Sequence, residues 1–453
     1  MLLLGNGRVA WFGTWIMFKS LFELYMRLTG YNIQLAAKYL KQIQQFDPEQ
    51  FQAWQDKQKW KIARYHYDHN PMYRQKVGSH FPDEWEALPI MKKSDYQLDL
   101  EQMLSEGFQR KNLYTANTSG SSGHPFFFAK NKAAHAMDWA LIKDRYQWHG
   151  LSLSSKQARF YGIPLGKWSY GKEILKDRLM NRVRFPVFDL SDEMLTQYAS
   201  IFQTKKFEYV YGYANSLLLF AQYLLKEHSV LKNICPSLKL CISTSEVLWP
   251  EDRETLSHAF GVKVINEYGA SEVGLLAFED QNADWLLCEE TLFMETIGEA
   301  EQQEQGLGSI VVTDLDNLAM PFIRYDIGDV GAFGEADKAT PNYRKLGSLF
   351  GRENDTIRLP SGKISPGLTF YYVSRSILES SNAFKEFIIR QTALDSFVFD
   401  IVSDRELSPD EVREIKNKME TYLEPGLKLE IRRVSKIERP ASGKRKHFYS
   451  ELN

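Results

Sequence analysis

The sequence predicts an α/β protein with a large multi-sheet N-terminal domain of parallel strands and helices, followed by a small C-terminal α+β domain. Its 453 residues exceed what one ordinary hydrophobic core contains. Short apolar runs alternate with helical stretches between residues 114 and 325, a pattern typical of parallel strands joined by helices. After Gly351 the pattern changes to two strands, a helix and a further strand. We therefore predict domains at residues 1–353 and 354–453.

The composition restricts the class of protein. It is 43% hydrophobic and 25% charged, as in folded globular proteins. The net charge of −2 provides no basic field, so we expect no nucleic-acid partner. The three cysteines, Cys235, Cys241 and Cys288, form no CxxC pair, which excludes a disulfide framework and a cysteine-rich zinc site. This usage fits a cytoplasmic protein.

The N-terminal segment is apolar but interrupted. Between residues 9 and 28, charged side chains recur every fourth position at Lys19, Glu23 and Arg27. A spanning helix needs about 20 predominantly apolar residues, so we expect neither a transmembrane segment nor a signal peptide. We predict an amphipathic helix packed on the body of the protein, with a membrane-surface helix as the alternative.

The remaining elements follow from local patterns. Residues 32–78 are helical and charged, and Asn70-Pro71 is expected to end a helix. A further helix start is expected at residues 92–95. Strands are predicted at 160–164, 207–213, 238–244, 262–269 and 308–315. In the C-terminal domain we predict strands at 384–391, 396–403 and 427–438 and a helix at 408–424.

The first motif is a Ser/Gly loop next to a strand. Its backbone N–H groups and hydroxyls are suited to surround phosphate oxygens, although an ordinary surface loop is the alternative. No Gly-Lys-Ser/Thr follows it, which argues against a P-loop kinase or GTPase. The motif consists of Thr118, Ser119, Gly120, Ser121, Ser122 and Gly123, followed by His124 and Pro125.

The second motif directly follows an apolar run and spans residues 266–272. Tyr268 offers a ring that can stack on a base, Ser271 a hydroxyl for a phosphate, and Glu272 an oxygen ligand for Mg²⁺. Taken alone, a Tyr-Gly turn after a strand is also a common structural feature.

Two further motifs follow. The third motif begins with Thr313-Asp314 and continues with Arg324-Tyr325-x-x-Gly328-Asp329. It ends with Gly351-Arg352 and Asp355. Near the end of the chain, Ser442-Gly443-Lys444 lies in a basic stretch. Each alone fits a turn or a solvated tail.

The order and spacing of the four motifs resemble the adenylate-forming superfamily of acyl-CoA synthetases, luciferases and peptide-synthetase adenylation domains. Within it, residues 59–74 and 308–331 are most similar to the phenylacetate–CoA ligase and capsule-biosynthesis branch. The resemblance implies activation of a carboxylic acid, for which an aryl acid is one candidate, by ATP and Mg²⁺ as an acyl-AMP, followed by acyl transfer.

The resemblance also implies residue roles. Residues 118–123 would orient the triphosphate, Tyr268 would stack on adenine, and Asp329 would accept the ribose hydroxyls, with Arg352 beside it. Glu272 would hold Mg²⁺, and Lys444 would bridge the substrate carboxylate and the ribose during adenylation. Asn354 and Asp355 would form the hinge. The nucleotide pocket would also include Ser245, Glu246, Glu267, Gly269, Ala270 and Ser271.

The sequence departs from the family pattern at three places. His124 stands where relatives usually carry a lysine. The segment after residue 272 offers only Cys288 where some relatives have a Cys/His cluster, so we expect no zinc. The polar turn between Ile357 and Lys363 resembles capsule-associated members more than CoA ligases.

The acid and its acceptor stay open. Aromatic residues near the expected pocket suit an aryl acid, but such residues are also common in cores. The acceptor is a thiol of CoA or a carrier protein, or, as the alternative, an amine or sugar. Cations that would suit CoA are Lys345, Arg358, Lys363, Arg445 and Lys446. The aromatic residues are Trp139, Tyr146, Trp148, Tyr161, Tyr211 and Tyr213.

Two other classes compete with the ligase interpretation: a non-catalytic nucleotide-binding protein, which the presence of Glu272, Asp329 and Lys444 disfavours, and a surface-associated anchor built on the N-terminal helix. A homodimer is an open alternative to a monomer.

Overall fold

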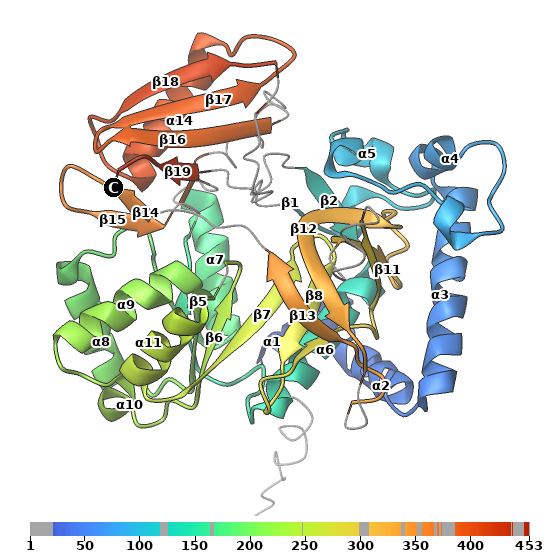
Figure 1. The fold of residues 1–453 in the computed structure, drawn as a ribbon, viewed down its shortest axis with the longest axis horizontal. Coiled ribbons are helices and arrows are strands. Elements are labelled where there is room, and N and C mark those ends of the chain that lie inside the picture. Colours follow the sequence, from blue (N-terminus) through green and yellow to red (C-terminus); the bar gives the residue numbers. More distant parts are fainter. Residues whose placement is uncertain are drawn as a thin grey trace, which may run out of the picture.

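The architecture comprises a large body and a smaller C-terminal sheet lying above it (Figure 1). The structure is a computed structural model. It describes residues 21–117, 126–163, 167–246, 248–298, 308–336, 340–350, 356–366, 369–370, 373, 386–435, 437 and 448–452. Among these residues, no helix is both long and apolar enough to cross a membrane.

The elements have the following bounds. The α-helices are α1 (Leu21–Leu28), α2 (Ile33–Ile43), α3 (Pro48–His69), α4 (Pro71–Val77), α5 (Leu100–Met103), α6 (Lys132–Trp148), α7 (Lys167–Leu179), α8 (Asp192–Thr204), α9 (Ala214–Lys226), α10 (Leu231–Ile234), α11 (Pro250–Phe260) and α14 (Pro409–Tyr422). Short 3-10 helices are η1 (Trp85–Ala87), η2 (Lys93–Tyr96) and η3 (Arg110–Asn112). The strands are β1 (Tyr114–Asn117), β2 (Phe127–Lys130), β3 (Gln157–Phe160), β4 (Arg182–Phe185), β5 (Tyr209–Tyr213), β6 (Leu240–Thr244), β7 (Lys263–Ala270), β8 (Gly274–Glu279), β9 (Trp285–Leu287), β10 (Leu292–Ile297), β11 (Gly308–Asp314), β12 (Tyr325–Gly334), β13 (Lys345–Phe350), β14 (Thr356–Arg358), β15 (Ile364–Pro366), β16 (Glu386–Ala393), β17 (Ser396–Val402), β18 (Lys428–Arg433) and β19 (Phe448–Ser450).

Local signals set the ends of the first helices. Asp47 and Gln50 form a reciprocal capping box at the start of α3, with Pro48 in the first turn. The predicted break at Asn70 is confirmed: α3 ends there, and the Asn70 side chain accepts a hydrogen bond from the Tyr73 N–H to start α4. Asn70 therefore joins two helices rather than ending the helical region.

Helix α1 is amphipathic, as predicted for this part of the N-terminal segment. Phe22 and Met26 are buried against the body, whereas Leu21 and Leu28 are exposed. Glu23 is also buried and forms an ion pair with Lys143 on α6 at 2.5 Å. The part of the predicted helix before residue 21 lies outside the described residues.

The central sheet of the described chain has eleven strands in the order β10-β11-β12-β13-β9-β8-β7-β6-β5-β3-β4. Only β3 to β7 run parallel; β7 to β13 pair antiparallel. The prediction of a parallel sheet is therefore wrong for the strand at 308–315 and its neighbours. A parallel connection needs a crossover of a dozen or more residues, usually a helix, and β7 turns straight back into β8 within three residues.

Helices cover both faces of the parallel strands. Apolar side chains of α8, α9 and α11 form one core with β3, β5 and β6. Side chains of α1, α2 and α6 form a second core on the other face, with β5, β6 and β7. Buried on both faces, these strands consist largely of apolar residues.

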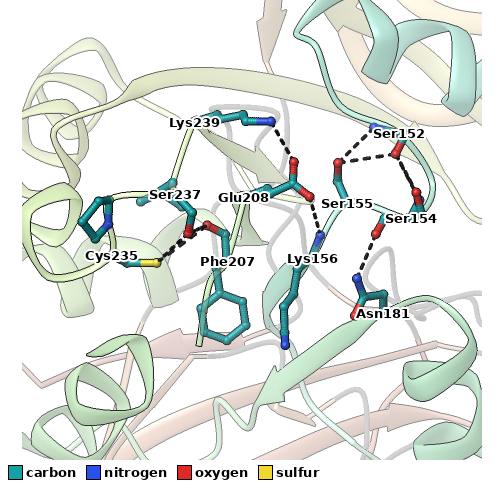
Figure 2. Close-up of polar contacts among 12 residues, drawn as sticks. Ser152, Ser154, Ser155, Lys156, Asn181, Phe207, Glu208, Cys235, Ser237 and Lys239 are labelled. Carbon is teal, nitrogen blue, oxygen red and sulfur yellow. Dashed lines mark hydrogen bonds and ion pairs between the residues drawn. The ribbon is translucent and has the colours of Figure 1, made fainter. Parts of the chain in front are cut away.

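Hydrogen bonds within the chain occupy the polar groups at the amino ends of β3, β5 and β6 (Figure 2). Glu208 accepts bonds from the Lys156 N–H (3.2 Å) and the Lys239 ammonium (2.8 Å), while the Ser237 hydroxyl donates to the Phe207 carbonyl (2.7 Å). Burial alone would raise the pKa of Glu208, but these bonds hold that pKa below its ordinary value. Because polar groups at this edge of the sheet bond to one another, functional groups are expected at the opposite edge, where the strands have their carboxyl ends.

The C-terminal elements confirm the strands and the helix predicted there. Strands β18-β17-β16-β19 form a sheet with α14, whose start carries a capping box between Ser408 and Glu411. Their core includes Phe188 of the large body, whose ring lies 5.0 Å from that of Tyr422 on α14. The predicted boundary at residues 353/354 lies outside the described residues and stays a prediction.

Candidate functional site

The described site residues lie in three places: after β6, at the end of β7, and in β12. Ser245 and Glu246 follow β6, residues 267–270 end β7 with Ser271 and Glu272 directly after it, and Asp329 lies within β12. The other predicted site residues lie outside the described part of the chain. These are Thr118, Ser119, Gly120, Ser121, Ser122, Gly123, His124, Arg352, Asn354, Asp355 and Lys444.

A tight hairpin between β7 and β8 presents Ser271 and Glu272. Ala270 pairs with Gly274, so the three residues between them form the turn. Gly274 has φ +97°, and a Cβ there would lie 2.8 Å from a carboxylate oxygen of Asp138. Glycine is therefore required at this position for both conformation and space. The turn leaves Ser271 exposed and buries Glu272.

Strand β12 contacts the second motif at two points. The Tyr268 hydroxyl donates to Asp329 Oδ2 at 2.9 Å, and the Tyr325 hydroxyl donates to Glu272 Oε1 at 2.8 Å. Strands β13, β9 and β8 separate β12 from β7 in the sheet order, so the sheet must curl to bring them together. The structure thus places four residues of two predicted motifs within one site.

Arg324 and Thr313 of the third motif bond to backbone groups outside the site. The Arg324 guanidinium donates to the carbonyls of Glu86 (2.7 Å) and Leu88 (2.9 Å) and pairs with Glu295 (3.2 Å). The Thr313 hydroxyl accepts the Arg324 N–H at 2.9 Å. Arg324 therefore anchors the start of β12 against the segment around η1.

The loop after β6 combines unusual backbone with a perturbed carboxyl. Ser245 has φ +69°, which is uncommon for a residue with a side chain. Its hydroxyl lies 3.2 Å from the Tyr161 hydroxyl. Glu246 accepts the Asn215 N–H at 2.8 Å, at the start of α9. Burial raises the pKa of Glu246 to about 7, despite this bond.

Glu267 is the second carboxyl with a raised pKa. Burial raises the pKa of Glu267, while a hydrogen bond from Tyr211 (2.6 Å), the charge of Arg159 and a hydrogen bond from Thr244 (3.3 Å) act in the opposite direction. Because both tyrosine and threonine donate to the same oxygen, the side chain is held in one orientation at the carboxyl end of the parallel strands.

A buried charged cluster beneath the β7–β8 hairpin was not predicted. The Lys130 ammonium lies 2.9 Å from Asp138 and 3.4 Å from Asp314. Despite burial, these carboxylates hold the pKa of Lys130 above its ordinary value. Only the fold shows this cluster, because its members come from β2, α6 and β11.

The aromatic residues predicted near the pocket fall into two groups. Trp139, Tyr146 and Trp148 on α6 belong to the core beneath the sheet. Tyr211 also belongs to this core, and Tyr213 to the core on the other face, but together with Tyr161 they form a group at the carboxyl ends of β3 and β5. The Tyr161 ring lies 5.7 Å from that of Tyr211 and 4.0 Å from that of Tyr213. Within this group, Tyr161 contacts Ser245 and Tyr211 contacts Glu267.

The site offers one carboxylate suited to magnesium. No group of three or more His, Cys, Asp or Glu in the described ranges could hold a metal ion. Mg²⁺ bound with nucleotide needs only one or two carboxylates, because phosphates and water fill its other positions. Glu272 fits this requirement: Tyr325 donates to Oε1, and Oε2 accepts no hydrogen bond from the described residues.

Comparison with known proteins defines the fold. No protein-family profile and no curated protein match the chain. The structure of 2-hydroxyisobutyryl-CoA ligase with 2-HIB-AMP and CoA in the thioesterification state matches with a TM-score of 0.56 at 17% identity, covering 90% of this chain and 91% of that chain. An open conformation of that enzyme, also with 2-HIB-AMP and CoA, matches with a TM-score of 0.51 at 18% identity, covering 86% and 89%. The chain therefore has the fold of the adenylate-forming enzymes.

Proposed function

We propose that the protein is an ATP-dependent, AMP-forming acid ligase. It activates a carboxylic acid as an acyl-AMP with release of pyrophosphate and then transfers the acyl group to a thiol, of CoA or of a carrier protein. The observation that carries this proposal is the double contact of β12 with the second motif, Tyr325 to Glu272 and Asp329 to Tyr268. Those contacts join the residues that the superfamily resemblance assigns to nucleotide and magnesium, on a fold that this superfamily shares.

The described residues provide the parts of a nucleotide site. The Tyr268 ring is suited to stack on adenine, and its hydroxyl orients Asp329, whose carboxylate is suited to accept ribose hydroxyls. The exposed Ser271 hydroxyl is available to a phosphate. Ser245, Glu246, Glu267, Gly269 and Ala270 complete the proposed pocket, with residues 118–123 and Arg352 contributing further contacts.

In the first half-reaction, a carboxylate oxygen of the acid attacks the α-phosphorus of ATP. The new O–P bond forms as the bond from that phosphorus to the bridging oxygen of pyrophosphate breaks, and pyrophosphate leaves with the electron pair. Mg²⁺ at Glu272 would neutralise phosphate charge. Lys444 would oppose the repulsion between two anionic reactants and stabilise the transition state.

In the second half-reaction, the acceptor attacks the acyl carbon and AMP leaves. Two of the cations considered for CoA already have structural partners: Lys345 pairs with Asp284 at 3.0 Å, and Lys363 donates to the Leu423 carbonyl at 2.6 Å. Arg358 is exposed on β14. We favour a thioester product, with a carrier protein at least as suitable as CoA, and keep amide or ester formation on an amine or sugar as the alternative.

Several finer expectations belong to the same proposal. Similarity at residues 59–74 and 308–331 supports the phenylacetate–CoA ligase and capsule-biosynthesis branch. We further propose a hinge at Asn354 and Asp355, a mobile C-terminal domain from residue 354, a cytoplasmic location and a monomer or homodimer.

Pyrophosphate release across a library of carboxylic acids tests the proposal. Release that requires ATP, Mg²⁺ and a specific acid is expected. The acyl-AMP is then formed in advance and supplied separately with CoA, phosphopantetheinylated carrier protein or amino sugars. Consumption only by the amine or sugar acceptors would replace the thioester assignment with the alternative. Absence of acid-dependent release would refute the ligase assignment.

A further inference from the structure

The parallel part of the sheet has one point at which the strand order reverses. The chain passes from β3 to β4 on one side and then returns to β5 on the other side of β3. In open parallel sheets, ligands bind outside the carboxyl ends of the strands at such a point. Here these ends carry Arg159 and Tyr161 from the β3 side, and Tyr211 and Tyr213 from the β5 side.

The Arg159 guanidinium lies between two tyrosine rings and forms no ion pair with the described residues. Its charge lowers the pKa of the nearby Glu267, but that carboxyl accepts its hydrogen bonds from Tyr211 and Thr244 instead. The central carbon of the guanidinium is 4.0 Å from the Tyr161 ring centroid and 4.6 Å from that of Tyr211. Its Nε is buried with no hydrogen-bond partner, and the guanidinium forms no ion pair with any described residue. By contrast, Arg145 pairs with Glu290 at 2.6 Å. A partly buried guanidinium that no described carboxylate contacts directly is suited to bind an anion supplied by a ligand.

The surrounding charges also favour an anion. Arg182 and Arg184 share Asp177 and Glu173 as ion-pair partners, whereas Lys176 forms no ion pair with the described residues. The excess of positive charge creates a local field that attracts anions.

Two hydrogen bonds connect the tyrosines that flank Arg159 to the proposed nucleotide site, one to the loop after β6 and one to β7. Tyr161, whose ring packs on Arg159, lies 3.2 Å from the Ser245 hydroxyl; Tyr211, the other ring, donates to Glu267 at 2.6 Å. A molecule bound between Arg159 and this loop would therefore extend from the proposed nucleotide site into the tyrosine-lined end of β3 and β5.

Resting on the proposed function, we propose that the acid substrate carries a second anionic group and that Arg159 binds that group. The reactive carboxylate itself is a poor partner for Arg159. It loses its charge on becoming the acyl-AMP, which would leave the guanidinium uncompensated, and a strong charge-assisted bond would lower its nucleophilicity. A second carboxylate or phosphate keeps its charge in both half-reactions.

The test compares matched acids that differ only in the second anionic group: succinate with butyrate, terephthalate with p-toluate, and 3-phosphonopropionate with butyrate to separate phosphate from carboxylate recognition. Pyrophosphate release gives kcat/KM for each acid. The wild-type protein should favour the doubly anionic acid by about tenfold to a hundredfold, the strength of a hydrogen bond to a charged group. In Arg159→Met this preference should disappear, and Arg159→Lys should restore part of it.

Arg64→Met is the matched control, because Arg64 also lies over aromatic rings, 5.3 Å from Phe81, but on α3. It should leave acid preference unchanged. If the wild-type protein and Arg159→Met both release pyrophosphate at equal rates with the two acids of every pair, the inference is overturned and the proposed function still stands. A rise in the KM for ATP without a change in acid preference would also overturn it by assigning Arg159 to the nucleotide. Absence of release with every acid would overturn the proposed function and the inference with it.

Discussion

Glu272 is held by the hydroxyl of Tyr325, a fully buried residue of β12. Glu272→Gln keeps the size of the side chain and removes the anionic ligand, so activity should fall and the Mg²⁺ concentration at half-maximal rate should rise. Tyr325→Phe removes only the orienting hydroxyl and should raise that concentration by about tenfold, as for other residues that orient metal ligands. Pyrophosphate release titrated with MgCl₂ measures both effects.

Tyr343→Phe is a suitable control for this titration. Its hydroxyl donates to Glu290 at 2.9 Å in a separate network, so it breaks a similar bond away from the hairpin. Its Mg²⁺ dependence should match the wild type. An unchanged dependence in Glu272→Gln would remove Glu272 from the proposed metal site.

Glu246 predicts a pH-dependent stability. Burial raises its pKa from 4.5 to about 7, so between these pH values the folded protein holds a proton that the unfolded chain releases. The free energy of unfolding contributed by this group therefore falls as pH rises through that window. Glu246→Gln removes the titration, so its stability relative to wild type should increase from pH 4 to pH 8, by on the order of 3 kcal/mol at most.

Urea unfolding at the two pH values measures this difference. Glu254→Gln, at an exposed position on α11, should show no such change between pH 4 and pH 8. If Glu246→Gln shifts stability equally at both pH values, the carboxyl does not titrate in this window.

At the scale of elements, the β7–β8 hairpin depends on Gly274. Gly274→Ala adds a Cβ at φ +97° and 2.8 Å from Asp138, so it should lower the free energy of unfolding by about 1–3 kcal/mol and reduce activity through Glu272. Gly78→Ala is the matched control, because Gly78 has φ +102° but no atom within 4 Å of the added carbon. Denaturant unfolding of both variants separates the effect of the Asp138 contact from that of backbone strain. If both variants lose the same free energy of unfolding, the Asp138 contact has no effect on stability.

The strands at 209–213, 240–244 and 263–270 could be predicted because apolar runs there match strands buried on both faces. The direction of the later strands could not. An apolar run gives no direction, and the decisive feature is the length of the connections after residue 270, where three residues leave no room for a crossover helix.

Only part of the site could be predicted for a similar reason. Tyr268, Glu272 and Asp329 were identified by motif order, but the bond from Tyr268 to Asp329 joins residues 61 positions apart through the curl of the sheet. Arg159 carried no signal at all, since a single arginine in a strand is uninformative until Tyr161 and Tyr211 are seen around it.

At the scale of the whole molecule, the C-terminal sheet and the large body share a core. Phe188 packs against Tyr422, and the Ser365 hydroxyl donates to the Val187 carbonyl at 3.4 Å. Ile163 of the large body also belongs to this shared core. The domain movement that we propose between half-reactions would require these contacts to separate.

Lys444 allows the two half-reactions to be separated. If the C-terminal domain supplies this lysine only during adenylation, Lys444→Ala should lower acid-dependent pyrophosphate release by a factor on the order of 10² or more, because a charge contact to the transition state is lost. Transfer from preformed acyl-AMP to the acceptor should change less than about threefold, since the lysine is then not needed. Lys416→Ala, at an exposed position on α14 of the same domain, should affect neither step strongly. Equal loss of both steps in Lys444→Ala would mean that the residue maintains the fold, and near wild-type pyrophosphate release would make it an ordinary residue of the basic tail.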